Sequence, residues 1–226
     1  MRSQPYFTLL ASLPPLPRFD HAERLPITKE RLRNRLSMLT PDDEELFHCA
    51  ADFLAWQRQT ATRTDEEMLA NFEKIETHIA HPVLQSIFAF PIDQRTIMAA
   101  LRRRFRGLPA PAPEEPWGVG RYVNHIRRNW DDAHFKLGAV YPWIAQACSH
   151  LEAGETLALE RLLKNTLWDH VDRSVPAYEF GFSAVLIYII KWDILQQWLS
   201  YDVEDAKVRF AELVAEVTDD HPPLWD

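Results

Sequence analysis

The spacing of apolar residues predicts helices along almost the whole chain. The clearest case is the run from Phe182 to Leu199, FSAVLIYIIKWDILQQWL, which is apolar around nearly its whole circumference. Such a helix must be buried on more than one side, inside its own chain or under a partner. A second helix is expected next, with an apolar stripe at Val203, Ala206, Phe210, Leu213 and Val217. These two helices indicate packing or binding and contain nothing typical of a reaction centre.

The first half of the chain carries more helix signals and one segment of a different kind. Residues 6–13, YFTLLASL, predict a short strand or extended segment that ends at nearby prolines. Gly107 is the expected C-terminal stop of the last helix in this half. The predicted helices run over 29–39, from Pro41 behind a Thr40 cap to residue 54, from a Thr64–Glu67 capping box to residue 79, between Pro82 and Pro91, and from Asp93 to Arg106.

A proline-rich segment at residues 107–118, GLPAPAPEEPWG, is the one obvious linker and separates residues 1–106 from residues 119–226. In the second half, helices are expected near 119–129, 142–153 and 155–165, before the two described above. Glycine is scarce, with 6 residues against 16 prolines, which favours helices joined by stiff connections. The sequence predicts an all-α fold with a short extended N-terminal segment. It is either one multi-helix bundle with a strap or two packed helical halves.

Bulk composition narrows the function classes without selecting one. The 226 residues, 46% of them apolar, can bury a sizeable core, and the net charge of −8 argues against a general nucleic-acid binder. Cys49 and Cys148 are expected to be small buried thiols. The N-terminus does not fit a signal peptide, and residues 180–190 are too short to span a bilayer. We expect a cytoplasmic protein that is peripheral at a membrane only through partners, without direct insertion.

The strongest charge feature is an arginine-rich helix end. Residues 91–128 have a local balance of +5, and residues 202–226 a balance of −6. One interpretation pairs the arginines with the helix dipole and the chain's own acidic tail. The other is a docking patch for an acidic protein surface, with anionic lipid as a third option. The arginines are Arg95, Arg102, Arg103, Arg104 and Arg106, and the opposite, apolar side of this helix is predicted to contain Met98, Leu101 and Phe105.

Lys191 is unusual because helical spacing places it on the apolar side of its helix, close to Trp198. A buried lysine needs a partner charge or loses its proton. A structural ion pair or a snorkelling side chain is one interpretation, and a Schiff-base lysine is the other, although no cofactor signal accompanies it. The eight tryptophans, Trp198 among them, favour core packing and partner binding equally.

Metal chemistry has only weak support in the sequence. Glu45 and His48 form a single ExxH step, which di-iron bundles use twice, and no second step follows. The other acid and histidine residues lack recognisable metal spacing and are expected to be caps, surface residues or satisfied interior groups. They are His78, His81, His125, Asp131, Asp132 and His134. Phosphate-loop, dinucleotide, HExxH and GxSxG motifs are absent from the sequence. No catalytic residue and no cofactor is predicted.

Three blocks of the sequence resemble a known family. Residues 6–14, YFTLLASLP, resemble the "YY-LVASLP" opening of a bacterial family of unknown function, and residues 95–104, RTIMAALRRR, resemble its middle block. Residues 180–198 resemble its "F-x-F-x-A-V-x-x-Y-x-x-K-x-x-I-L-x-x-W" close. The genes of that family typically lie in operons for V/A-type rotary ATPases. The family is distantly similar to the non-catalytic central-stalk component of those ATPases, a helical funnel between the rotor shaft and the membrane ring.

The resemblance implies a helical, non-catalytic component or assembly factor whose partners are V/A-type ATPase subunits. The alternative is a soluble helical metal- or ligand-binding protein, or an enzyme of unknown reaction, that uses Glu45 and His48 or the region from His125 to His134. Self-association is a third possibility. The candidates for partner contact are Arg95, Arg102, Arg103, Arg106, Lys191 and Trp198.

Overall fold

The structure is a computed structural model that describes residues 6–48, 82–115, 117–174 and 180–219. Its elements are α1 (Phe7–Ser12), the 3₁₀ helix η1 (Phe19–His21), α2 (Lys29–Leu36), α5 (Pro82–Phe105), α6 (Val123–Arg128), α7 (Trp143–Ala153), α8 (Thr156–Ser174) and α9 (Phe182–Asp219). A further helix begins at residue 41, and its described part ends at residue 48. The described ranges contain helices and no β-strand, which confirms the predicted all-α, multi-helix fold.

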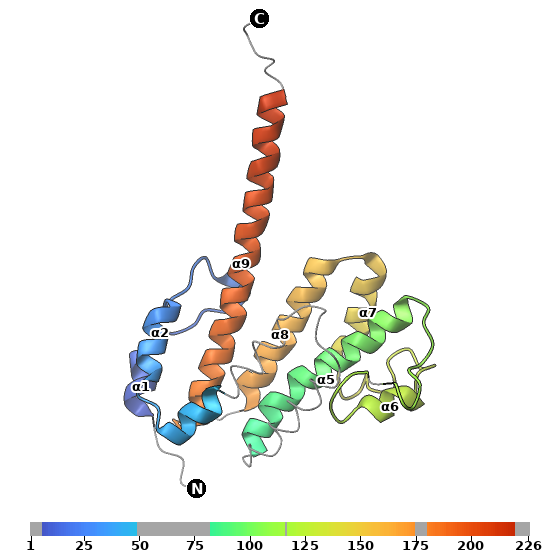
Figure 1. The fold of residues 1–226 in the computed structure, drawn as a ribbon, viewed down its shortest axis with the longest axis horizontal. Coiled ribbons are helices and arrows are strands. Elements are labelled where there is room, and N and C mark those ends of the chain that lie inside the picture. Colours follow the sequence, from blue (N-terminus) through green and yellow to red (C-terminus); the bar gives the residue numbers. More distant parts are fainter. Residues whose placement is uncertain (1–5, 49–81, 116, 175–179, 220–226) are drawn as a thin grey trace, which may run out of the picture.

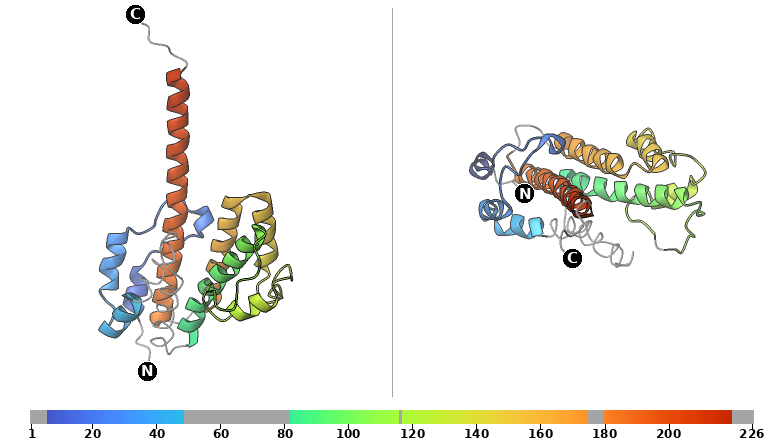
Figure 2. Two further views of the ribbon diagram at one scale, coloured as in Figure 1. Left: turned by 45° about the vertical axis from the view of Figure 1, so that its right-hand side comes forward. Right: turned by 90° about the horizontal axis from the view of Figure 1, so that it is seen from above.

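The helices are arranged around α9. The first half of α9 lies between α1 and α2 on one side and α5 and α8 on the other (Figures 1 and 2). On the far side of α8, α7 packs against both α8 and α5, and α6 packs against α5. The second half of α9 extends beyond the rest of the described chain. With 38 residues, α9 is about 57 Å long at a rise of about 1.5 Å per residue.

Two hydrophobic clusters make up the described core. The first surrounds α9, where Val185, Leu186 and Leu195 are completely enclosed. The second lies between α5, α7 and the segments that join them, with Ile97 and Ile144 at its centre. Each cluster takes residues from before and after the proline-rich segment 107–118. The division of the chain into two halves stays a prediction, but the core is shared across it.

Several local signals in the sequence act as predicted. Thr40 caps the helix that follows it, since its side-chain oxygen accepts the backbone N–H of Asp43 at 3.3 Å. Thr28, which the sequence analysis did not single out, caps α2 in the same way through the N–H of Arg31. Gly107 follows the end of α5 with a φ of +72°, the left-handed geometry that glycine adopts most easily. The helices predicted near 119–129, 142–153 and 155–165 correspond to α6, α7 and the longer α8.

The prediction of an extended segment at residues 6–13 is wrong. Phe7–Ser12 forms α1, and only Leu13 after it is extended. The buried residues are Tyr6, Leu9 and Leu13, at helical spacing, and they pack into the cluster around α9. A short apolar run is ambiguous between strand and helix, and among the described residues this one has no strand to pair with.

Two predicted helix boundaries are also absent. Pro91 does not separate two helices but lies inside α5, which continues because Ile87 and Phe88 before it and Ile92 after it are all buried. This packing outweighs the local cost of a proline in a helix. The two helices predicted around residues 182–199 and 203–217 are one helix, α9, because the intervening residues 200–202 contain no glycine or proline.

The segment after α5 returns along that helix. The hydroxyl of Thr96 accepts the backbone N–H of Val119 at 2.9 Å and donates to the carbonyl of the same residue. Trp117 and Val119 are buried, and the ring of Trp117 belongs to the second cluster. The segment therefore lies against α5 as a strap. The helix predicted from Thr64 to residue 79 lies outside the described residues.

Candidate docking surfaces

An open groove lies between α1 and the first half of α9. It has a volume of about 320 Å³. The hydroxyl of Tyr188 donates to the carbonyl of Pro14 at 2.9 Å, which ties the two walls together. The lining is apolar except for Tyr188 and Lys191, and consists of Leu10, Leu13, Pro14, Pro15, Leu16, Ala184, Ile187, Tyr188 and Lys191. We call this feature the α1–α9 groove.

Aromatic side chains lie where the two walls of the groove begin. The rings of Phe7 and Phe180 are 4.5 Å apart, and 54% and 38% of these residues are exposed. Beside them, the backbone N–H of Tyr6 donates to the carbonyl of Phe180 at 2.6 Å. The residue before α1 and the segment just before α9 are thus joined at this point. Exposed aromatic rings next to an apolar groove are typical of surfaces that bind another chain.

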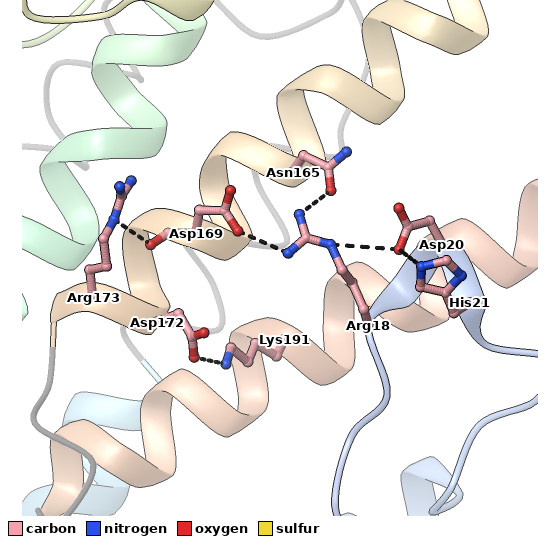
Figure 3. Close-up of polar contacts among 8 residues, drawn as sticks. All are labelled: Arg18, Asp20, His21, Asn165, Asp169, Asp172, Arg173 and Lys191. Atoms are coloured by element: carbon pink, nitrogen blue, oxygen red, sulfur yellow. Dashed lines mark hydrogen bonds and ion pairs between the residues drawn. The ribbon is translucent and has the colours of Figure 1, made fainter.

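At the other end of the groove, Lys191 is fixed by an ion pair and an aromatic contact (Figure 3). Its Nζ forms an ion pair with Asp172 of α8 and lies 4.9 Å from the centre of the Trp168 ring. The lysine side chain is 16% exposed and that of Asp172 is 58% exposed. The interpretation of Lys191 as a structural ion pair is therefore confirmed. A Schiff base would need a neutral amine, which this ion pair opposes.

A second polar connection joins α8 to the segment before η1 (Figure 3). The guanidinium of Arg18 donates to Asn165 at 2.6 Å and to Asp169 at 3.0 Å, and lies 3.6 Å from Asp20. The backbone carbonyl of Asp169 also accepts a bond from Arg173 at 3.0 Å, within α8. Cations and carboxylates alternate here, so the end of the groove has no net excess of either.

Trp198 is a core residue in this structure. Only 5% of it is exposed, and its ring lies 5.1 Å from the ring of Phe19. The guanidinium of Arg161 covers another side at 5.2 Å from the ring centre. The contact of Trp198 with a partner stays a prediction, but the side chain offers little surface for one.

The arginines at the end of α5 fall into two groups. Arg103 forms an ion pair with both carboxylate oxygens of Glu115 and donates to the carbonyl of Pro109 at 2.8 Å. Arg104 donates to the carbonyls of Trp130 and Asp132. These two side chains therefore fix the loops beside α5.

The other arginines of α5 face outward to different degrees. Arg102 and Arg106 are exposed, whereas Arg95 is half-buried and has a partner of its own. Met98 and Leu101 are buried as predicted, but Phe105, expected on the same apolar side, is 59% exposed. The reason is that α5 ends at Phe105, beyond the helices that cover its earlier turns. The second half of α9 extends beyond the body and lies apart from this end of α5 (Figures 1 and 2).

The candidate metal ligands do not come together. His48 lies 3.8 Å from Glu44, not from Glu45, and both members of that pair are exposed. The His125 ring donates to the carbonyl of Phe135 at 2.9 Å, and Asp132 accepts two backbone N–H groups in the same turn. Among the described residues, no three His, Cys, Asp or Glu side chains are grouped as metal ligands would be. His78 and His81 lie outside the described residues, as does Cys49.

The most buried polar cluster escaped the sequence analysis. Asp93 of α5 is only 1% exposed, and its Oδ2 accepts bonds from Arg121, at 2.8 and 2.9 Å, and from the hydroxyl of Tyr141, at 2.8 Å. Its Oδ1 has no hydrogen-bond partner. Burial raises the pKa of Asp93, against the opposing effect of Tyr141 and Arg121. The one available signal was an acid within the apolar turns of α5. Asp93 belongs to α5 and Arg121 follows the strap, so the cluster fastens the strap to α5.

Comparisons with known proteins identify the family. None of the described helices combines the length and the apolar character that crossing a membrane requires. Comparison with curated proteins and comparison with solved structures give no match. Residues 49–221, about three quarters of the chain, match the family described as "Protein of unknown function (DUF2764)". The chain therefore belongs to the DUF2764 family.

Proposed function

We propose that this protein is a non-catalytic helical subunit or an assembly or accessory factor of a bacterial V/A-type rotary ATPase, and that it acts through protein–protein contacts. The proposal starts from the resemblance of residues 6–14, 95–104 and 180–198 to a family encoded beside such ATPases. It is supported by the kind of surface that these residues form in the folded chain.

One observation carries the proposal. The first and last of the three resembling blocks are more than 160 residues apart in the sequence, yet they form the two walls of the α1–α9 groove. The groove is apolar, open and accompanied by the exposed rings of Phe7 and Phe180. Such a surface gains free energy when a second chain removes it from water. Its only ionisable groups are Lys191, which is already paired, and the phenol of Tyr188, which bonds Pro14.

The length of α9 adds a second means of contact. Its second half extends beyond the body, where it is accessible to another protein (Figures 1 and 2). Long helices that leave a compact body are common in proteins that connect other subunits, because a helix maintains its direction over tens of ångströms. A groove and a projecting helix on one chain are suited to an accessory role in a larger assembly.

The test is affinity purification of the tagged full-length protein from its native cell, with the co-eluting chains identified by mass spectrometry. We expect ATPase subunits among them. Stoichiometric recovery would indicate a permanent subunit, and substoichiometric recovery an assembly factor. The reproducible absence of ATPase subunits, from cells in which the ATPase is expressed and intact, would overturn the proposal.

Variants of the groove make the test specific. Ile187→Asp places a charge in the lining, whereas Ala184→Phe fills the groove without adding charge. If both variants lose the ATPase subunits, the loss does not depend on one kind of substitution alone. Leu157→Asp is the matched control, because Leu157 is 54% exposed on α8 and does not line the groove. Both groove variants should lose the ATPase subunits while the control retains them. Equal recovery with all three variants would exclude the groove as the contact.

A further inference from the structure

The end of α5 presents an exposed apolar residue beside two cations. Phe105 is 59% exposed, and Arg102 and Arg106 beside it are exposed. Residues three and four positions apart are neighbours on a helix surface, so Phe105 and Arg106 both lie one turn beyond Arg102. Leu108, 47% exposed, follows directly after the helix. We call Arg102, Phe105, Arg106 and Leu108 the arginine end of α5.

The two arginines at this surface are not used by the described fold. Within the described ranges, neither the Arg102 nor the Arg106 guanidinium has an ion pair or a side-chain hydrogen bond, in contrast to Arg103 and Arg104. The following loop contains two acids, Glu114 and Glu115, and Glu115 is bonded to Arg103, which lowers the pKa of Glu115. The positive charge of Arg102 and Arg106 is therefore available to a second molecule.

The surface is held in place before any partner binds. The backbone N–H of Leu108 donates to the carbonyl of Arg103 at 3.2 Å, and that of Gly107 donates to Arg104 at 2.8 Å. Arg103 then binds Pro109 and Glu115, while Glu115 accepts the N–H of Ala112 at 3.1 Å. These bonds fix the loop that carries Leu108 against the end of the helix. A surface ordered in advance loses little conformational entropy on binding.

The shape of the exposed face favours a helix as the partner. Ala99 is exposed one turn before Arg102, so the face of α5 that contains Ala99, Arg102 and Arg106 runs over about 10 Å along the axis at about 1.5 Å per residue. The small side chain of Ala99 allows another helix to approach closely. We propose that the arginine end of α5 binds an acidic amphipathic helix of another protein, with Phe105 as the apolar anchor and Arg102 and Arg106 paired to carboxylates.

This inference deepens the proposed function, because it gives the chemistry of one partner surface. The chain's own acidic segment, residues 202–219, belongs to the second half of α9, which extends beyond the body and lies apart from the arginine end of α5 (Figures 1 and 2). This separation favours a partner other than the chain's own acidic segment. Use of the same segment from a second copy would make a head-to-tail contact that need not close into a defined oligomer, which favours a different protein.

The experiment uses the full-length chain and a pair of designed probes. The first is a fluorescent three-heptad peptide with leucine at its core positions and glutamate on the flanks, and its twin carries lysine in place of every glutamate. Binding is measured by fluorescence anisotropy at low and high salt. We expect the acidic peptide to bind, with an affinity that falls as salt rises, and the basic peptide not to bind.

Three variants decide which residues are responsible. Arg102→Glu/Arg106→Glu should lower the affinity for the acidic peptide by more than about tenfold. Phe105→Ala should lower the affinity for the acidic peptide by about tenfold without changing the salt dependence of binding, because the substitution removes apolar area and no charge. The control is Arg31→Glu/Arg35→Glu, which reverses an exposed arginine pair with the same spacing on α2 and should leave binding unchanged.

The results that would overturn the inference are distinct from those that concern the ATPase. Equal binding of both peptides, no binding of the acidic peptide, or equal effects of the α5 and α2 reversals would each overturn it. A dimer in sedimentation that Arg102→Glu/Arg106→Glu abolishes would identify a second copy as the occupant and overturn the assignment to another protein. If ATPase subunits still co-purify after any of these results, the proposed function stands without this surface. If the peptide binds as expected but no ATPase subunit is recovered, only the proposed function fails.

Discussion

Replacing Tyr141 with phenylalanine tests the buried cluster that fastens the strap to α5. The Tyr141 hydroxyl donates to Asp93 Oδ2 at 2.8 Å and accepts from Arg121 at 3.1 Å. Phenylalanine retains the ring and its edge contact with Phe90, whose centre is 5.8 Å away. The substitution therefore removes two hydrogen bonds and very little apolar contact. Any change in stability reports on the polar cluster alone.

The expected loss of stability depends on how few other groups contact the Asp93 carboxylate. A hydrogen bond to a charged group contributes about 1.5–3 kcal/mol, more than a bond between neutral groups. Because Oδ1 already has no partner and Asp93 is only 1% exposed, water cannot replace the lost donor. Arg121 remains, so the carboxylate is not left without a counter-charge. We expect the free energy of unfolding to fall by about 2 kcal/mol at pH 7.

The sign of the pH dependence follows from the pKa of Asp93. Burial raises this pKa above its ordinary value of 3.8, so the folded state binds the proton more tightly than the unfolded state. The contribution of Asp93 to stability is therefore fully present below pH 3.8 and declines as pH rises through the raised, folded pKa. The bond from Tyr141 opposes this decline by favouring the charged form. The cost of Tyr141→Phe should accordingly be smaller at pH 4 than at pH 7.

The assay is equilibrium urea unfolding of the wild type and the variant at both pH values, with the denaturant slope compared to confirm that only the midpoint moves. Tyr122→Phe is the matched control. Tyr122 contacts the Tyr141 ring, but its hydroxyl makes no hydrogen bond among the described residues. Two results would refute the reasoning. One is a decrease in the free energy of unfolding for Tyr141→Phe that differs from that of Tyr122→Phe by less than about 0.5 kcal/mol. The other is a larger decrease at pH 4 than at pH 7.

Two further predictions concern the backbone and a histidine of the same region. Gly118→Ala should lower the free energy of unfolding by about 2 kcal/mol or more, because φ is +56° and the added Cβ would lie 2.8 Å from Thr96 Cγ2. Gly107→Ala, with a φ of +72° but open space around the site, should cost only about 1 kcal/mol in the same urea assay. Burial lowers the pKa of His170 below 6.5, so its contribution to stability should decline as pH falls through 6.5 towards the folded pKa. An NMR titration of His170 at or above 6.5 would contradict this.

The parts of the fold predicted from sequence are those set by local chemistry. The cap at Thr40 and the stop at Gly107 act through atoms within a few residues, so each can be recognised in the sequence. The short α1 and the continuous α5 depend on distant contacts instead. Leu9 is enclosed in a cluster whose other residues come from distant parts of the chain, α9 among them, and Pro91 is tolerated because buried residues on both sides hold the helix.

The same distinction between local pattern and distant contacts applies to the polar sites. Helical spacing placed Lys191 on an apolar face and led to the expectation of an ion pair, but it could not identify Asp172, which lies on another helix. Asp93 was overlooked because its partners, Arg121 and Tyr141, follow it by 28 and 48 residues in connecting segments. A carboxylate with distant partners has no signature in the sequence, and only the path of the strap brings the three groups together.

At the arginine end of α5, both the local sequence pattern and the contacts with distant elements matter. Periodicity alone placed Phe105 on the buried side, because its spacing continues that of Met98 and Leu101. Burial, however, depends on whether a neighbouring element reaches that turn, and α5 extends beyond its cover by the time it reaches Phe105. The last turn of α5 exposes an aromatic ring beside Arg102 and Arg106, neither of which has an ion pair among the described residues, and a partner that covers the ring would remove this apolar surface from water.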